Sequence, residues 1–258
     1  MRRQSLGLVM GAAAFLWGVP ALAKGCTLGA VGQTVSLAVG DSGRPTLLHL
    51  PKGFSRARPA ALVILLHGSG GTGAQMLAAS KLADAADVHG FIVAAPDAGI
   101  PAQKGFVWNI PGVPSVTGKI PGPGDADDVA FLTSMIDWLA KSRCVDPARV
   151  YATGLSGGGR MTSWLGCVAA DHLAAIAPVV GLRAGNPLAG NPRLPDPATC
   201  QPARPMPVMA FAGDADRTNP IEGGGAPYWQ YTMATALTRW ADLDGCRTGP
   251  VQRDLGDD

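Results

Sequence analysis

One continuously apolar segment limits the possible folds of this chain more than any other feature. Residues 60–66 read Ala-Ala-Leu-Val-Ile-Leu-Leu, and the sequence His-Gly-Ser-Gly-Gly follows directly. A strand with apolar residues on both faces is typical of a parallel sheet that helices cover on both sides. The segment therefore predicts a buried central strand that ends in a glycine-rich loop.

Strand and helix patterns alternate along the rest of the chain. Two alternating segments, near 34–39 and 46–50, predict an antiparallel hairpin before the central strand. This order of elements predicts a doubly wound α/β fold with right-handed crossovers. The later elements are expected as a helix over 73–88, a strand over 91–95, a helix over 125–141, a strand over 149–153, a helix over 157–169, strands over 174–180 and 207–211, and a helix over 230–241.

The first residues predict an export signal. Two arginines precede an apolar stretch over residues 6–19, and the small residues of a cleavage site follow at 21–23, so a signal peptide is expected over residues 1–23. The apolar stretch is shorter than the ~20 residues that cross a bilayer, which favours a cleaved signal over a membrane anchor. We therefore expect a secreted or periplasmic protein whose mature part, residues 24–258, forms a single domain.

The charges of the expected mature chain balance. The whole chain carries 21 basic and 19 acidic residues, for a formal charge of +2. The predicted signal contains two of the arginines and no acidic residue, so the mature chain is neutral. A neutral chain without a long basic run argues against nucleic-acid binding and fits a neutral substrate. We expect no membrane partner, and the oligomeric state stays open.

Five cysteines lie in a chain that is expected to reach an oxidising compartment, where thiols tend to pair. They are Cys26, Cys144, Cys167, Cys200 and Cys246. Cys144 and Cys167 flank a predicted strand and the helix that returns from it, which predicts a disulfide between them. Cys246 is the candidate for the unpaired thiol. No cysteine or histidine cluster has metal-ligand spacing, so we expect neither a metal site nor a cofactor.

A G-x-S-x-G motif lies between a predicted strand and a predicted helix. Residues 154–158 read Gly-Leu-Ser-Gly-Gly, with Ser156 at the centre. A sharp strand-to-helix turn holds such a serine in a strained conformation, and it needs flanking glycines because larger side chains would collide with nearby backbone. The motif also occurs by chance in glycine-rich chains. Its position here predicts a catalytic nucleophile rather than a structural turn.

The glycine-rich loop after the central strand predicts a second part of the same site. α/β-Hydrolases place such a loop after an earlier buried strand, where it supplies one backbone N–H of the oxyanion hole. Ser69 is the candidate donor in this loop, and Gly157, at the start of the helix after the nucleophile, is the other. A plain turn residue is the alternative interpretation of Ser69.

The catalytic acid is expected after a later strand, because the chain order in this fold is nucleophile, acid, histidine. Residues 212–216 read Ala-Gly-Asp-Ala-Asp, so Asp214 and Asp216 are both candidates. Trp108 and Trp229 are candidates for lining an acyl or aromatic pocket, with packing in the core as an equal alternative. The acidic cluster over 125–128 predicts a helix cap rather than a catalytic carboxylate.

Together these segments resemble the secreted esterase family that includes polyhydroxybutyrate depolymerase-like proteins and feruloyl esterases. The similar stretches span nearly the whole mature chain and read LLHGSGGTG, DADDVAFL, CVDPARVYATGLSGGG, AAIAPVVG and GDADRTNP. The resemblance implies an α/β-hydrolase fold and hydrolysis of carboxylic esters such as hydroxyalkanoate oligomers or feruloyl-type esters. In such proteins the acid turn reads like G-T-A-D-P-x-x-P, which favours Asp216 over Asp214.

This sequence lacks the catalytic histidine that the family carries near its C-terminal end. That histidine follows one more strand in a G-G-G-H-like turn, whereas this sequence has no histidine after Asp216. His172 lies beyond the helix that follows the nucleophile, too far away to act as its base. His49 and His89 are expected at the opposite edge of the sheet. Only His67 is expected at the catalytic edge, where it would shape the oxyanion loop; a role as the base is the alternative.

Two hypotheses explain the missing histidine, and a third concerns the kind of bond that the protein hydrolyses. The favoured one is an ester hydrolase whose given chain is C-terminally incomplete and lacks the last strand and helix of the fold. The second is a complete, non-catalytic relative that binds esters or polymers. The third is a secreted serine peptidase of the same fold, which would share the nucleophile turn and the oxyanion loop.

Overall fold

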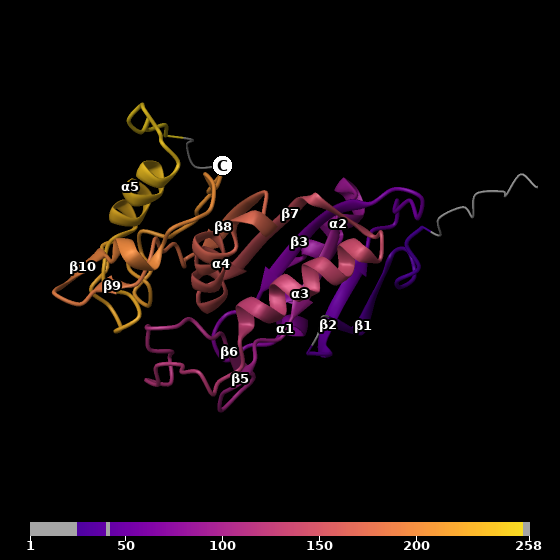
Figure 1. The fold of residues 1–258 in the computed structure, drawn as a ribbon, viewed down its shortest axis with the longest axis horizontal. Helices are drawn as coiled ribbons and strands as arrows, with labels where there is room; N and C mark the ends of the chain where they lie inside the picture. The colour runs from indigo at the N-terminus through magenta and orange to yellow at the C-terminus, as the bar shows by residue number, and fades with distance from the viewer. Residues whose placement is uncertain (1–24, 40–41, 255–258) are drawn as a thin grey trace, which may run out of the picture.

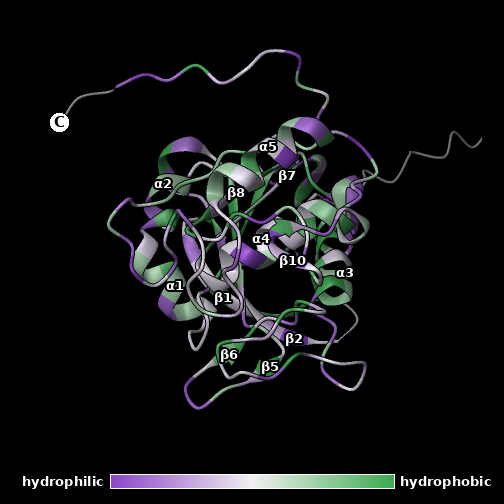
Figure 2. Ribbon diagram, turned by 90° about the vertical axis from the view of Figure 1, so that its left-hand side faces the viewer, coloured by the Kyte–Doolittle hydropathy of each residue, from purple (hydrophilic) through white to green (hydrophobic). Residues whose placement is uncertain are grey.

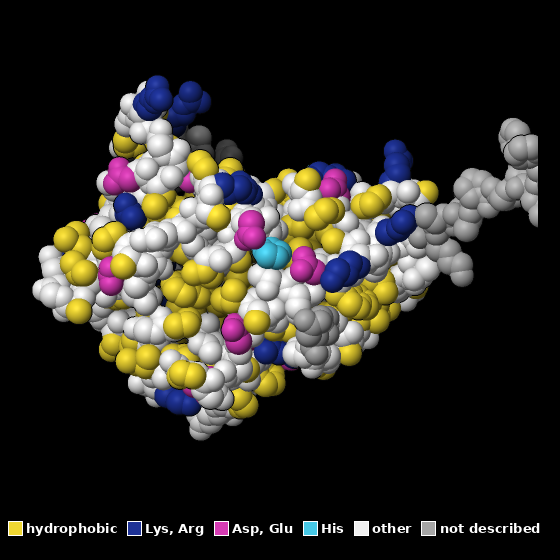
Figure 3. Space-filling model, in the orientation of Figure 1, with side chains coloured by type: hydrophobic (Ala, Val, Ile, Leu, Met, Phe, Trp, Pro, Cys, Tyr) yellow, Lys and Arg dark blue, Asp and Glu magenta, His cyan; other side chains and the backbone are white. Residues whose placement is uncertain are grey.

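The computed structural model describes residues 25–39 and 42–254. The predicted signal peptide lies outside the described residues, which include all the candidate site residues. Within the described part, no helix is long and apolar enough to cross a membrane. Figure 3 shows acidic and basic side chains scattered over one face, without a large patch of either sign.

A six-stranded sheet forms the centre of the molecule (Figure 1). Its order is β1-β2-β4-β3-β7-β8, with antiparallel pairing of β1 with β2 and of β2 with β4, and parallel pairing elsewhere. The predicted hairpin and the buried central strand, β3, are therefore confirmed. The strands of this sheet are Gln33–Val39 (β1), Arg44–Leu50 (β2), Ala60–Leu66 (β3), Ile92–Pro96 (β4), Val145–Leu155 (β7) and Ala175–Val179 (β8).

Helices cover both faces of this sheet. Leu65 of β3 packs with Leu77 and Ala86 of the first two helices, while α3 and α4 pack on the other face. The single helix predicted over 73–88 is broken at Lys81, whose φ of +57° lies in the left-handed region. Figure 2 shows hydrophobic and hydrophilic residues along α1, α2 and α3, as expected of helices with one face in the core. The helices are Gly73–Ser80 (α1), Leu82–His89 (α2), Asp128–Lys141 (α3), Gly157–Val168 (α4) and Met233–Leu243 (α5).

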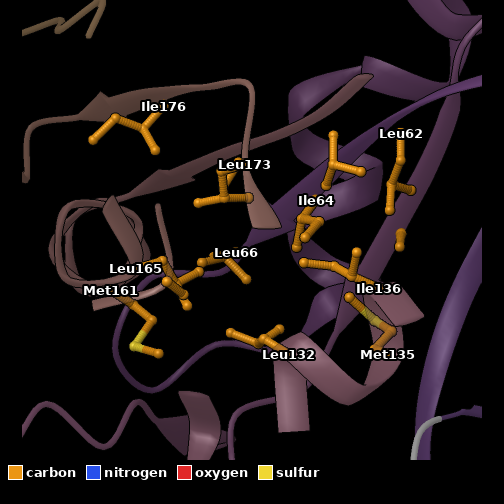
Figure 4. Packing of buried hydrophobic residues seen from close by; sticks show 14 of the residues in the cluster. Leu62, Ile64, Leu66, Leu132, Met135, Ile136, Met161, Leu165, Leu173 and Ile176 are labelled. Atoms are coloured by element: carbon orange, nitrogen blue, oxygen red, sulfur yellow. The ribbon is translucent and has the colours of Figure 1, made fainter. Parts of the chain in front are cut away.

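The larger part of the core lies between the sheet and the helices α3 and α4. Leu62, Ile64 and Leu66 alternate along β3, so they point to the same face of the sheet. There they meet apolar side chains of α3 that include Leu132 and Met135 (Figure 4). All five side chains are fully buried. Burial on both faces explains why β3 is apolar at every position.

Residues 207–211, which we call the edge segment, extend the sheet beyond β8. Val208 and Phe211 form isolated parallel bridges with β8, but the segment does not form a continuous ladder. Proline at its first position has no N–H to donate. The side chains of Met209 and Phe211 are 63% and 51% exposed. The predicted strand over 207–211 is therefore present only as an extended edge, paired on one side.

The disulfides differ from the predicted pairing. Cys26 bonds to Cys144 and Cys167 bonds to Cys200, with 4.6 Å between the Cα atoms of each pair. The predicted disulfide between Cys144 and Cys167 is therefore wrong. The prediction treated β7 and α4 as a hairpin, whereas α4 crosses to cover a face of the sheet, so its end lies beside a later loop. Cys246 is a free, exposed thiol, as predicted.

The acidic residues before α3 do more than cap the helix. Asp127 is the N-cap residue of α3, as predicted. Asp128 is fully buried, pairs with Arg44 of β2, and accepts hydrogen bonds from the N–H groups of Gly99 and Asn109. Burial raises the pKa of the Asp128 carboxyl. This side chain therefore fastens the long loop after β4 to the sheet.

Four short strand pieces lie outside the central sheet. β5 and β6 form a small hairpin in the loop after β4, and β9 and β10 form another in the loop after β8. The two long glycine- and proline-rich loops after β4 and β8 therefore each contain a hairpin of their own. These four pieces are Ile100–Pro101 (β5), Phe106–Val107 (β6), Pro187–Leu188 (β9) and Asn191–Pro195 (β10).

Candidate active site

Ser156 lies at the sharp turn between β7 and α4. Its φ of +54° and ψ of −110° form a strained conformation that side chains other than glycine rarely adopt. The Ser156 N–H donates to the carbonyl of Val179 on β8 at 2.9 Å, and its own carbonyl accepts from the N–H of Arg160 at 2.9 Å. Backbone on both sides thus holds the turn, in the strand-turn-helix context that the motif requires.

Close backbone contacts explain the glycines around Ser156. A Cβ atom at Gly158 would overlap the carbonyl of Leu66 and lie 2.7 Å from the carbonyl oxygen of His67. A Cβ atom at Gly154 would lie 2.7 Å from the Leu66 oxygen. Such distances are shorter than real side-chain contacts. The turn therefore packs directly against the end of β3 and the start of its loop.

The two predicted oxyanion donors are neighbours in space. A Cβ atom at Gly157 would overlap Oγ of Ser69 and lie 2.9 Å from the Ser69 backbone nitrogen. Gly157 is the first residue of α4, so its N–H has no partner within the helix. Among the described residues, neither N–H donates to a protein acceptor. Two such neighbouring donors are suited to bind one oxyanion.

His67 holds the loop that carries Ser69. Its side chain is buried, its Nε2 accepts from the N–H of Ala98 at 3.0 Å, and its Nδ1 lies 2.8 Å from the Gly68 carbonyl oxygen, so Nδ1 carries the proton. The Trp108 ring lies 4.9 Å from the imidazole, and burial lowers the pKa of His67. Because both ring nitrogens are engaged, the imidazole is not placed to take a proton from Ser156.

The other three histidines lie away from this turn. His49 on β2 contacts Asp87 through Nε2 at 3.1 Å, and His172 contacts Asp171 through Nδ1 at 3.1 Å. His89 is the exposed last residue of α2. Within the described part of the chain, no hydrogen bond or ion pair joins any of them to the turn at Ser156. None of the four histidines is therefore positioned as a base.

Asp216 lies in the turn after the edge segment. Its Oδ1 accepts from the N–H groups of Thr218 and Asn219, at 2.8 and 2.9 Å. The other candidate, Asp214, is exposed. Because the edge segment and β7 both run parallel to β8, this turn emerges at the same edge of the sheet as Ser156. The structure brings the two turns to one edge but does not show a contact between the two side chains.

The two candidate tryptophans are both buried, with 3% exposure for Trp108 and 2% for Trp229. Nε1 of Trp229 donates to the carbonyl of Pro220, and the guanidinium of Arg183 lies 3.7 Å from its ring centroid. Trp108 lines a small cavity together with Ser69. Burial thus favours the core interpretation for Trp229, whereas Trp108 is both a core residue and a wall of that cavity.

Two buried arginines next to the nucleophile turn were not found from the sequence. Arg160, in the first turn of α4, is 5% exposed, and its Nη2 lies 3.4 Å from Oγ of Ser69. Arg183, in the loop after β8, is 8% exposed. Burial lowers the pKa of Arg160 to about 10 and that of Arg183 to about 9, so both stay charged at neutral pH. The sequence offered one signal for Arg160, because an arginine among the small and apolar residues at the start of α4 is unusual.

These groups together can support acyl transfer. The structure presents a hydroxyl on a strained turn and, beside it, two backbone donors without protein partners. Within residues 25–39 and 42–254, no group of three His, Cys, Asp or Glu side chains could hold a metal ion. The hydroxyl and the two N–H donors suit nucleophilic attack at a carbonyl carbon.

Comparison with known proteins gives the family. No family model matches the chain. Feruloyl esterase B from Piromyces equi is 34% identical over 221 residues, which cover 83% of this chain and 38% of that protein. Poly(3-hydroxyalkanoate) depolymerase C from Paucimonas lemoignei is 34% identical over 135 residues, 52% of this chain and 30% of that protein. This chain belongs to their esterase family. The matched stretches span less than half the length of both relatives.

The fold of this esterase-family chain also matches a solved structure. A thermostable esterase superposes with a TM-score of 0.56 at 20% identity, over 82% of this chain and 52% of that one. At this identity the likeness concerns the fold alone. The α/β-hydrolase fold predicted from the sequence is therefore confirmed.

Proposed function

We propose that this esterase-family chain is the catalytic part of a secreted carboxylic ester hydrolase. Ser156 is its nucleophile, the N–H groups of Ser69 and Gly157 form its oxyanion hole, and Asp216 is its acid. One observation carries the proposal, namely the strained Ser156 beside two backbone donors that have no protein partner. The names of the relatives, a feruloyl esterase and a polyhydroxyalkanoate depolymerase, support an ester as the substrate.

The geometry suits a two-step reaction. In the first step Oγ of Ser156 attacks the ester carbonyl carbon, a base takes the hydroxyl proton, and the two N–H groups bind the oxyanion that forms. Collapse of the tetrahedral intermediate releases the alcohol, which receives that proton, and leaves an acyl-serine. In the second step water attacks the acyl group, and the carboxylic acid departs. The base in this scheme is none of the four histidines of the sequence.

Substrate and location rest on two supports. Feruloyl-type esters and hydroxyalkanoate oligomers are the substrate classes that the relatives' names suggest. The two disulfides support an oxidising compartment, because such bonds persist mainly in exported proteins. The disulfides thus support the export that the first residues of the sequence predict.

A probe for the nucleophile tests this proposal without a native base. Residues 24–258 are treated with a fluorophosphonate, with and without added imidazole, and the adduct is mapped by peptide mass spectrometry. Because general base catalysis is worth about 10²–10⁴ in rate, imidazole is expected to accelerate labelling of Ser156 by a measurable part of that factor. Parallel assays compare p-nitrophenyl butyrate, methyl ferulate and a peptide p-nitroanilide.

The matched control is Ser156→Ala, which should lose both the adduct and the imidazole-dependent ester turnover. An adduct at another serine would refute the assignment of Ser156. Faster turnover of the anilide than of either ester would favour the peptidase hypothesis. Ester binding without any labelling would favour the non-catalytic relative.

A further inference from the structure

A small cavity beside the turn at Ser156 is lined by several hydrogen-bond donors, two of which have no partner in the described structure. Arg160, Trp164 and Arg183 all contribute to its wall. Nε of Arg160 and Nε1 of Trp164 are both buried and have no hydrogen-bond partner in the described structure. Buried donors that lack an acceptor are costly, and native proteins rarely retain them without a ligand or water. We refer to this space as the donor cavity.

The charges of its two arginines are not neutralised by the described residues. Neither arginine lies within ion-pair distance of a described carboxylate. Arg183 donates to the carbonyls of Leu182 and Tyr228, at 3.2 and 2.5 Å, and Arg160 lies 4.3 Å from the Tyr228 ring centroid. Carbonyls and aromatic rings orient these guanidinium groups but carry no negative charge. Two buried cations side by side therefore lack a counter-ion.

The donor cavity adjoins the candidate oxyanion hole. A second small cavity is lined by Ser69 and Gly157, and it shares Arg160, Ile110 and Val113 with the donor cavity. Arg160 therefore stands between the two oxyanion donors and Arg183. A group bound in the donor cavity would lie only a few bonds from a carbonyl held at the oxyanion hole.

We propose that the donor cavity binds a carboxylate of the substrate, so that the preferred substrates are esters that also carry a free acid group. This inference rests on the proposed function, because it places the ester carbonyl at Ser156. A carboxylate offers acceptors only, and the planar fork of arginine matches its two oxygens. An oligomer of a hydroxy acid with a free carboxyl end is one ester of this class.

The proposal changes one conclusion from the sequence. The balanced net charge of the expected mature chain fitted a neutral substrate. Net charge sums over the whole surface, however, and does not describe two cations buried next to one turn. The local field beside Ser156 is positive although the expected mature chain as a whole is neutral.

Two ligands that differ only in charge test the proposal. The linear dimer of 3-hydroxybutyrate, as the free acid and as its methyl ester, is titrated into the Ser156→Ala variant of residues 24–258, and dissociation constants are measured by calorimetry at low salt. We expect the acid to bind about tenfold tighter or more, as charge-assisted hydrogen bonds predict. Equal binding of the two ligands would overturn the proposal. Because the variant cannot turn over an ester, the result does not depend on catalysis.

Substitutions of arginines test whether the preference for the free acid over the methyl ester arises in the donor cavity. Arg160→Met is expected to abolish it. Arg149→Met removes an exposed arginine that pairs with Asp146 in the first half of β7, and it is expected to leave the preference unchanged. Thermal melts check that each variant folds. Should Arg160→Met fail to fold, Arg160→Lys, which keeps a point charge but loses the fork, is expected to weaken the preference. An undiminished preference in a folded Arg160 variant would overturn the proposal.

Discussion

The nucleophile turn and the acid turn lie at the same edge of the sheet, but the chain holds them in different ways. Around Ser156 the backbone is packed so tightly that a Cβ atom at Gly158 would overlap the end of β3. In the acid turn, a Cβ atom at Gly213 would meet nothing within 4 Å, and Asp216 bonds only to backbone of its own turn. The geometry at Ser156 is thus imposed by distant backbone, whereas that at Asp216 is set locally.

The largest expected effect comes from filling space in the two turns. Gly158→Ala is expected to lower the free energy of unfolding by about 3 kcal/mol or more, because the backbone of β3 cannot move aside. Gly213→Ala, the matched change in the acid turn, should stay within about 0.5 kcal/mol. Urea unfolding followed by tryptophan fluorescence measures both. Equal effects at the two positions would break the comparison.

A pH dependence is expected on the nucleophile side. Burial lowers the pKa of His67 in the folded chain below its value of about 6.5 in the unfolded chain. As the pH falls, the imidazole is therefore protonated in the unfolded chain before it is protonated in the folded one. The His67 contribution is therefore fully present above pH 6.5, and as pH falls it is lost by at most about 1.4 kcal/mol per pH unit. His67→Gln is expected to remove this part of the pH dependence.

Urea unfolding at pH 7.5, 6.5 and 5.5 provides the measurement for His67. At pH 7.5 the His67→Gln variant should already be less stable by about 1–3 kcal/mol, since buried hydrogen bonds are disturbed. His89→Gln, at the exposed end of α2, is the control and should behave like the parent. A pH profile that is unchanged in His67→Gln would show that the buried imidazole does not titrate as its contacts imply.

The smallest expected effect concerns backbone strain. Ser156→Gly should be more stable than Ser156→Ala by about 1 kcal/mol, because glycine tolerates a φ of +54°. In the acid turn Ala215 does not have a positive φ, so Ala215→Gly should destabilise by about 0.5–1 kcal/mol instead. Thermal and urea unfolding of the three variants show whether glycine raises or lowers the free energy of unfolding in each turn. The same sign in both turns would mean that Ser156 is not strained.

Local sequence was sufficient for the features that depend on neighbouring residues. The glycines around Ser156 and the apolar run before His67 specified the strained turn, the central strand and the loop between them. Hydrophobic periodicity likewise predicted most helices and strands, although Lys81 breaks one helix and the edge segment forms no full strand. These features follow from backbone conformation and from alternation of buried positions, which a sequence displays directly.

Only the tertiary structure decided which distant groups meet. Cys144 pairs with Cys26 rather than with Cys167, and the pairing follows from how α4 crosses the sheet. Arg160 and Arg183 come together beside the nucleophile turn although a strand and a loop separate them in the chain. Neither result has a local signature, because side-chain contacts between remote segments depend on the packing of whole elements. The sequence by itself therefore determined the strained turn that holds Ser156, while the tertiary structure decided the charge of its surroundings.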